Sequence, residues 1–529
     1  MNDLENSTIS IKDLIKGLSN EEINSIRKYL NCFDETFGNT KTKTANLFDL
    51  LISDENLSPK EIINLLYTNP SSEDAFDKLS KRLSEKIHEC LLLDVNVERK
   101  DVYPDYIKAS IDVRKKIMQA NIMLGRGLFN DNNDIFDKII LKARKFELYT
   151  ELVEVLYLKQ RYLGFRKGKV EFDKITDDIC FSEKSRDAIN KALNYYYQLI
   201  INKDFSSINQ VDRNLFEESI IELQNLYKFT KSANVGYYLH LIEFEFYQLN
   251  GQYHEAKLVS LKLVDLIQEN PSIYMKRRLG SAFVRLSENE LHTCDFKEAA
   301  LHARLAQDYF HKNTINHNIA RETEFFSYFY QGNLEKAEKI INGLVEDSKN
   351  IHSEFRHAKQ AFWAANVAFL LNKKKETVNL LNQTKEIDKD KEGWNIGVRI
   401  LSIMNQIESD GTDLAESQIE NMRKHIERTM KMKEVRPRDI TILRILNELV
   451  SQSFDFQAVW KSRKQMFEQL ASFEGDQAWT INSHEMVLFH EWFKAKALQS
   501  EYPLAIQIPD TIIGPNAFES GSYHKAVSE

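Results

Sequence analysis

A short pattern recurs six times in the C-terminal half of this chain, and it limits the fold more than any other feature of the sequence. The clearest copies end at Ala256, Ala299 and Ala337, and weaker copies end at Val378, Ala415 and Val459. Successive copies are separated by 43, 38, 41, 37 and 44 residues. A repeat of this length is typical of helical hairpins that stack on their neighbours, without one central core. We therefore predict an extended array of hairpins.

Residues that break helices are scarce over most of the chain. The 529 residues include 8 prolines and 17 glycines, and between Pro104 and Pro503 the only prolines are Pro271 and Pro437. Proline removes a helical hydrogen bond and glycine weakens a helix, so this scarcity favours nearly continuous helix. A hydrophobic fraction of 42% with 28% charged residues is typical of a folded protein. The sequence predicts an all-α fold.

The charge and composition exclude several classes of protein. A net charge of -8 gives no overall attraction to nucleic acid or to an anionic membrane. The sequence contains no apolar stretch long enough for a membrane helix, and its first residues lack the pattern of a secretory signal. Four scattered cysteines form neither a disulfide framework nor a CxxC pair. We expect a cytoplasmic protein with no membrane partner and no cofactor.

The sequence divides into four regions. We predict a small N-terminal helical domain in 1–100, an irregular helical region in 101–235, the repeats in 236–470, and a final helix, strap and tail in 471–529. Proline and β-branched residues in 501–516 predict an extended strap that packs on the last hairpin, because its isoleucines would be unfavourable in water. A turn-like stretch near residues 145–149 indicates that the array could begin before residue 200.

The N-terminal domain has well-marked helix starts. Ser19 and Glu22 fit a capping box, in which the serine oxygen accepts one free backbone N–H and the glutamate accepts another; Ser58 and Glu61 fit a second. A long amphipathic helix is predicted after Ser72 from apolar residues spaced three and four apart. These residues are Phe76, Leu79, Leu83, Ile87 and Leu91.

The copies Gly251–Ala256 and Gly332–Ala337 resemble the turn of the tetratricopeptide repeat (TPR), which has glycine, then an aromatic residue or leucine, then alanine. The resemblance covers 236–470, with a longer period than the family's ~34 residues and with Cys294 and Lys373 in place of the glycine. It implies a right-handed superhelical solenoid of about six TPR-like hairpins. It also implies a non-enzymatic adaptor that holds a protein or peptide in a concave groove.

The groove in such a solenoid would be lined by the first helix of each hairpin. Tyr238, Ile242 and Phe246 are four residues apart and so share one face of the first helix of the first clear copy. We predict them as partner-binding residues. The alternative is that they belong to the core between hairpins.

A second partner-binding candidate is a basic cluster between residues 421 and 438. Arg423, Arg428 and Lys431 belong to it, and a helix that ends near Pro437 would be stabilised by cations in its last turns. That structural role competes with binding of an acidic protein segment or a phosphate-bearing ligand.

The N-terminal domain leaves a DNA-binding alternative open. Helices at 58–67 and 72–93 resemble a helix-turn-helix or winged-helix pair, in which one set of cations would face phosphates. These cations are Lys78, Lys81, Arg82 and Lys86. Residues 1–100 carry 18 acidic and 13 basic side chains, so repulsion from the DNA backbone opposes docking.

Catalytic and metal motifs are weak. His484, Glu485 and His490 are similar to the HExxH zinc motif, but the histidines are six residues apart, so on a helix they point to different sides. The sequence contains no phosphate-binding loop of the GxxxxGK[ST] type and no GxSxG motif. We predict no metal site and no catalytic residue.

These observations favour a scaffold or adaptor that binds a protein or peptide. One alternative is a transcriptional regulator, with DNA-binding helices in 1–100 and the array as a sensor. Another is a hydrolase or phosphatase-like signalling activity hosted on the array, which would need a buried cluster of titratable residues in a pocket.

Overall fold

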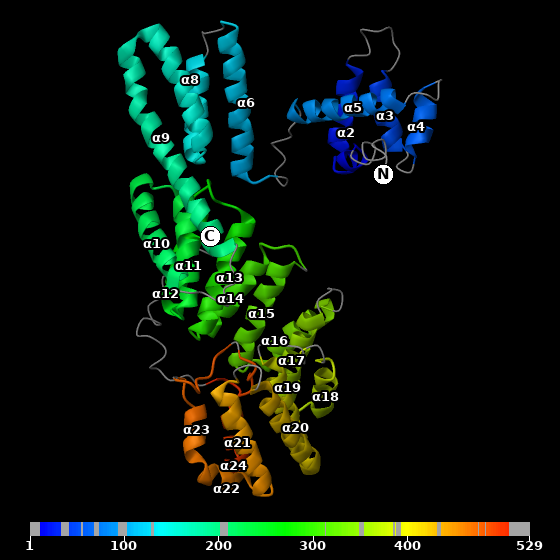
Figure 1. Cartoon of the computed structure of the whole chain (residues 1–529), viewed down its shortest axis with the longest axis vertical. Helices are drawn as coiled ribbons and strands as arrows, with labels where there is room; N and C mark the ends of the chain where they lie inside the picture. The colour runs from blue at the N-terminus through cyan, green and yellow to red at the C-terminus, as the bar shows by residue number, and fades with distance from the viewer. Residues whose placement is uncertain are drawn as a thin grey trace. The chain divides into compact units, whose positions relative to one another are not determined.

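A computed structural model of the chain shows two compact units, Met1–Tyr103 and Pro104–Glu529, and each is described by itself (Figure 1). The structure describes residues 11–32, 42–53, 57–67, 73–93, 103–127, 132–201, 210–312, 314–348, 354–384, 387, 393–430, 435–473, 475–481 and 483–506. Within these residues every regular element is a helix, which confirms the all-α prediction. No helix among them is long and apolar enough to span a membrane.

The first unit is a small helical domain. Its helices are α2 (Asn20–Asn31), α3 (Lys43–Ser53), α4 (Pro59–Leu66) and α5 (Glu73–Leu93). Both predicted capping boxes are present at Ser19 and Ser58. The predicted stripe of α5 faces the core, where Phe76, Leu79, Leu83 and Ile87 are buried and Leu91 is partly buried.

The second unit begins with long helices that pack in sequence order. They are α6 (Asp105–Gly125), α7 (Asn132–Lys145), α8 (Tyr149–Lys167), α9 (Lys169–Tyr196), the short π-helix η2 (Tyr197–Ile201) and α10 (Gln210–Thr230). Each α-helix packs on the next one in the chain. This arrangement continues directly into the repeats.

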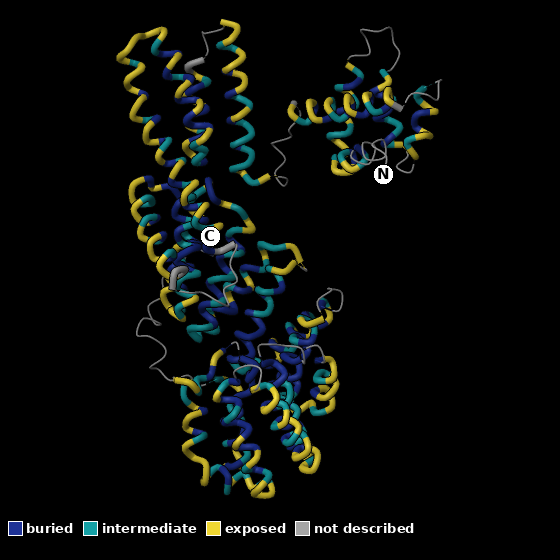
Figure 2. The backbone as a smooth tube through the Cα atoms, viewed as in Figure 1, coloured by how far each residue is buried: buried dark blue, intermediate teal, exposed yellow. Residues whose placement is uncertain are grey.

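Six helical hairpins follow. They are α11 (Ala233–Leu249) with α12 (Tyr253–Glu269), α13 (Lys276–His292) with α14 (Phe296–Gln307), α15 (Ile315–Tyr330) with α16 (Leu334–Ser348), α17 (Glu354–Leu370) with α18 (Lys374–Leu381), α19 (Trp394–Glu408) with α20 (Thr412–Met430), and α21 (Pro437–Ser451) with α22 (Phe456–Ser462). The array is TPR-like, and buried residues run through its successive hairpins (Figure 2).

All six hairpin turns use one backbone device. Gly251 has a positive φ, its N–H bonds to the carbonyl of Gln248, and the next N–H bonds to the carbonyl of Tyr247. This pair of bonds defines the Schellman motif, which satisfies carbonyls at a helix end. The equivalent positive-φ residues in the other turns are Cys294, Gly332, Asn372, Asp410 and Ser453. Four side-chain types, those of cysteine, asparagine, aspartate and serine, thus replace glycine in a backbone conformation that glycine adopts most easily.

The repeated small or aliphatic residue lies one turn into each second helix. Its N–H makes the first hydrogen bond of that helix, as from Ala256 to the carbonyl of Gln252 at 3.0 Å. Five of the predicted positions have no exposed surface, namely Ala256, Ala299, Ala337, Ala415 and Val459. The sixth was misplaced by one residue. Val378 is 43% exposed, and Thr377 is the buried equivalent, because Asn372 and not Lys373 takes the glycine position.

The same turn occurs before the predicted repeats. Glu147 has a positive φ between α7 and α8, and Leu148 N–H bonds to the carbonyl of Ala143. Leu152, one turn into α8, is buried. The hairpin device therefore extends into 101–235, as the stretch near residue 145 indicated.

The last helices in the described part of the chain are α23 (Lys464–Leu470) and α24 (Phe489–Leu498), and the described residues between them are largely non-helical. Beyond α24, Ile506 N–H bonds to the carbonyl of Tyr330 at the end of α15. Residues 504 and 505 pass so close to Gly332 that a Cβ there would lie 2.9 Å from the Ala505 nitrogen. The first residues of the predicted strap thus pack on the third hairpin, not the last one; 507–516 lie outside the described residues.

Candidate functional site

The surface built by the first helices of the hairpins holds the candidate site. We call this surface, contributed by α11, α13, α15, α17, α19 and α21, the first-helix face. Neighbouring first helices contact one another directly, as α13 does α15 and α17 does α19. Side chains from several hairpins therefore converge on one continuous surface.

Part of the first-helix face is hollowed into a groove of about 330 Å³. Five first helices, from α11 to α19, contribute its walls. The lining residues are Gln248, Glu288, Leu291, His292, Ile319, Glu322, Thr323, Phe326, Lys359, Trp363 and Trp394. We call this groove the open section of the face.

Aromatic rings form one wall of the open section. Phe326 meets Trp363 edge to face, with ring centroids 4.8 Å apart, and the Trp394 ring lies 6.4 Å from that of Trp363. The Lys359 ammonium lies over the Trp394 ring, 4.2 Å from its centroid. The indole N–H of Trp363 is buried and has no acceptor among the described residues. Such a donor is unfavourable unless a partner satisfies it.

Two carboxylates, those of Glu288 and Glu322, also line the groove. Glu322 Oε1 accepts hydrogen bonds from Arg356 and from the Gln360 amide, at 2.8 Å each. Glu288 has no hydrogen bond or ion pair in the described part of the chain. Burial raises the pKa of Glu288 to about 7, and the charges of nearby carboxylates add to this rise. The Glu288 carboxylate is thus desolvated without a compensating partner.

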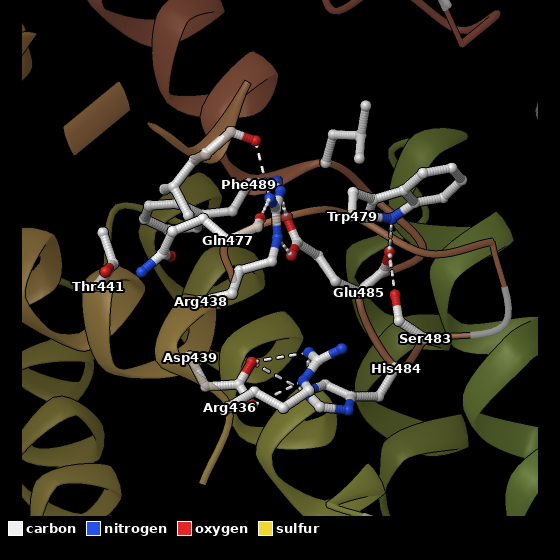
Figure 3. Close-up of polar contacts among 12 residues, drawn as sticks. Arg436, Arg438, Asp439, Thr441, Gln477, Trp479, Ser483, His484, Glu485 and Phe489 are labelled. Carbon is white, nitrogen blue, oxygen red and sulfur yellow. Dashed lines mark hydrogen bonds and ion pairs between the residues drawn. The ribbon is translucent and has the colours of Figure 1, made fainter. Parts of the chain in front are cut away.

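The next part of the same face is covered by the chain itself. Residues 475–481 and 483–488, which we call the covering segment, lie against the first helices α15, α19 and α21 in a largely non-helical conformation. The part of the face beneath them is the filled section, and Figure 3 shows the polar contacts at its centre. Its centre is Arg438 on α21, which is 2% exposed and pairs with Glu485. The Arg438 Nη1 atom also donates to the carbonyls of Leu470 and Gln477, at 2.8 and 2.7 Å.

A second polar cluster lies beside this ion pair (Figure 3). His484 Nε2 lies 3.0 Å from Asp439 Oδ1 and 2.7 Å from Arg436 Nη2. Burial acts to raise the pKa of Asp439, but His484 and Arg436 together hold it below its usual value. At Gly397 on α19, an added Cβ would lie 2.5 Å from the His484 carbonyl oxygen. Only glycine leaves room for the segment there.

Further contacts hold the segment along its length. The Tyr330 hydroxyl donates to the Ile481 carbonyl at 2.8 Å, and the ring of Tyr330 packs edge to face on Trp479. The Trp479 indole donates to the Glu485 carbonyl at 2.8 Å. Trp394 borders both sections, since its ring lies 6.4 Å from that of His484 and it also lines the groove. The two sections are therefore parts of one surface.

The predicted groove residues of α11 have different surroundings. Ile242 is completely buried in the core with Phe216 and Leu223, so no partner can reach it. Phe246 packs on Phe216 of α10, the helix that precedes α11 in the chain. Tyr238 is half-buried in a cluster of tyrosine rings. None of the three lines the open section, to which α11 contributes Gln248 instead.

The predicted basic cluster is not one surface. Arg423 on α20 pairs with Glu420 and Glu427, and Arg428 is exposed with its Nε donating to the carbonyl of Lys424. Lys431 lies outside the described residues. The last members of the cluster face the interior, where Arg436 and Arg438 hold the covering segment.

The histidine motif is not helical at its first residue. His484 and Glu485 lie in the covering segment, and His490 is buried in α24, where burial lowers its pKa to about 4. In the described residues no three potential ligands converge as a metal site requires. Of the four cations considered for DNA, Lys81 and Lys86 pair with Asp77 and Glu89 on α5.

A larger hollow of about 490 Å³ lies between α6 and α8. Its lining is mostly apolar and includes Leu124, Tyr162 and the exposed ring of Phe165. No buried polar atom without a partner is found among its described lining residues. The open section, which has such an atom, is therefore the stronger candidate.

Comparison with protein-family models found no match, and neither did comparison with curated proteins. Among solved structures, the chain is similar to a signal transduction ATPase with numerous domains (STAND) protein with a tetratricopeptide repeat sensor from Pyrococcus horikoshii. The TM-score is 0.41 with 8% sequence identity, and the alignment covers 79% of this chain and 64% of that one. This chain thus spans less than two thirds of that protein. A likeness this low carries no argument, so the TPR-like description rests on the hairpins and turns themselves.

Proposed function

We propose that this protein is a non-enzymatic cytoplasmic scaffold whose first-helix face captures a segment of another protein. The observation that carries the proposal is the filled section, where this face already holds an irregular stretch of polypeptide. Backbone carbonyls of that stretch are bound by Arg438 and Tyr330 on first helices. The same type of surface continues uncovered into the open section.

The open section has the chemistry that a bound segment needs. Ile319 is partly exposed in the groove and offers apolar area that would leave water on binding, beside the buried Leu291 and Phe326. The Trp363 N–H is a donor without an acceptor, and a backbone carbonyl of a partner could satisfy it. Apolar area with a few placed polar groups is typical of a binding site.

The two alternatives have less support. A hydrolase would need several titratable groups that contact one another in an open cavity, but Asp439 and His484 are buried where the covering segment packs on α21, and Glu288 has no hydrogen-bonded neighbour among the described residues. For a regulator that binds DNA, two of the four candidate cations in 1–100 already pair with carboxylates. Both therefore rank below the scaffold.

The proposal can be tested by affinity capture from the source cell with the full chain and two matched variants. Ile319→Glu places a charge in the groove, whereas Leu301→Glu places the same charge on exposed surface of the second helix α14. We expect a protein partner to be retained by the wild type and Leu301→Glu and lost with Ile319→Glu, with unchanged circular dichroism. Equal retention by both variants would contradict the proposal.

A further inference from the structure

We infer that the open section selects a partner segment carrying a lysine or arginine side chain, and that this cation pairs with the Glu288 carboxylate. The inference rests on the proposed function and names the chemistry of its ligand. It follows from the position of Glu288 within the groove and from the groups that surround it.

Glu288 differs from the carboxylates near it. Glu322, which also lines the groove, is paired with Arg356, and Glu245 on α11 faces Arg285 at 3.6 Å. Glu288 on α13 has no such partner in the described residues. A desolvated carboxylate gains most from a hydrogen-bonded cation, because charge-assisted bonds strengthen where water is excluded. A basic side chain supplies that cation.

Cations of the protein itself do not take this place. The charge of the Arg285 guanidinium acts to lower the pKa of Glu288, but Arg285 makes no hydrogen bond or ion pair with Glu288 in the described residues, and its Nη2 lies 3.6 Å from Glu245. Lys359, on α17, lies over the Trp394 ring and is not among the charges that shift Glu288. A cation brought by a partner is therefore the complement that the groove lacks.

The second observation that points to a ligand is the Trp363 indole. Trp363 is 5% exposed, lines the same groove, and its N–H has no acceptor among the described residues. A partner's backbone carbonyl fits this donor, as the Ile481 carbonyl fits the Tyr330 hydroxyl in the filled section. A peptide satisfies both groups at once, whereas a lone metal ion or amine would leave the indole unpaired.

Binding of the cation should depend on pH. The pKa of Glu288 is about 7 in the free protein, so the fraction of Glu288 that is ionised and able to pair with a cation rises between pH 6 and 8. Burial lowers the pKa of neighbouring His292 to about 4, so this ring stays neutral over that range. The charges that act on Glu288 are those of Arg285 on its own helix, of Glu245 on α11 and of Glu322 on α15. Affinity should rise with pH and level off above pH 8.

The experiment uses full-length protein and four peptide display libraries. Each library has random uncharged residues around a fixed central lysine, arginine, glutamine or glutamate. At pH 8 we expect the lysine and arginine libraries to be enriched about tenfold or more over the glutamine library. Glu288→Gln should abolish this preference, whereas Glu298→Gln, on the second helix α14, should keep it. Glu288→Lys should transfer the preference to the glutamate library.

The outcomes separate this inference from the proposed function. If the four libraries bind equally well, and Ile319→Glu but not Glu288→Gln reduces binding, the segment-binding function stands and the cation preference is wrong. If no library binds, the proposed function fails first. A preference for lysine and arginine that is the same at pH 6 and pH 8, or that survives Glu288→Gln, would also overturn the role of Glu288.

Discussion

The open and filled sections of the first-helix face are built from the same kind of helix but differ in how their polar groups are satisfied. In the filled section Arg438 is buried and contacts a carboxylate and a carbonyl of the covering segment, together with the Leu470 carbonyl at the end of α23. In the open section Glu288 and the Trp363 N–H are desolvated without partners. The two sections also differ in charge, because the first helix contributes the cation of Arg438 in the filled section and the carboxylate of Glu288 in the open section.

The two sections are therefore expected to affect the stability of the array in opposite ways. Buried charges are stable only when paired and hydrogen-bonded, so the covering segment is part of the fold. Buried polar groups without a partner, such as the Trp363 N–H, instead reduce stability. Trp394 marks the border, because it lines the groove and also packs near His484.

The largest effect is expected from breaking the central ion pair of the filled section. Arg438→Met leaves the Glu485 carboxylate buried without its cation, which should lower the free energy of unfolding by about 3–5 kcal/mol. Urea unfolding of the full chain measures this. The control Arg423→Met removes an exposed pair with Glu420 and should leave the midpoint unchanged. Similar losses for both variants would mean that the segment is not held by Arg438.

A smaller effect is expected at Gly397. Gly397→Ala places a methyl group against the His484 carbonyl oxygen and should destabilise by about 1–3 kcal/mol, although alanine favours helix. Hydrogen exchange in 475–488 should accelerate. Gly125→Ala on α6 is the control, because nothing lies within 4 Å of its new methyl group. Unchanged hydrogen exchange in the covering segment would contradict the close packing of that segment on Gly397.

The smallest effect concerns the open section alone. The pKa of Glu288 is about 7 in the folded chain and 4.5 as its ordinary value, so the folded state holds the proton more tightly. This group's contribution to stability therefore falls as pH rises from about 4.5 to 7 and is constant above that. Glu288→Gln should raise the melting temperature more at pH 8 than at pH 5. An equal change at both pH values would show that Glu288 is not desolvated.

The hairpin pattern could be read from sequence because it depends on local chemistry. A buried small or aliphatic residue follows each turn, and glycine or a short side chain supplies the positive φ. The predicted position Val378 is one residue beyond the buried Thr377. Asn372 takes the place of glycine in this turn, so no glycine in the sequence indicates where the turn lies. Local patterns thus fix the repeat to within one residue.

The site could not be read in this way. Tyr238, Ile242 and Phe246 share a spacing, but which stripe of α11 faces the groove depends on the stacking of neighbouring hairpins. In the sequence, His484 and Glu485 are similar to part of a helical metal motif. Their partners in the structure lie on α21, more than 40 residues earlier in the chain. Contacts across such distances leave no mark in a local pattern.

One tie in the filled section bears on how the number of hairpins can change. In an ordinary repeat protein each unit touches only its neighbours, so terminal units can be lost or duplicated. Here the Tyr330 hydroxyl bonds to a carbonyl 151 residues later, and Ile506 bonds back to the same tyrosine. Removing the last units would uncover the end of α15. Gain or loss of repeats in evolution should therefore be restricted to the part of the array before α15.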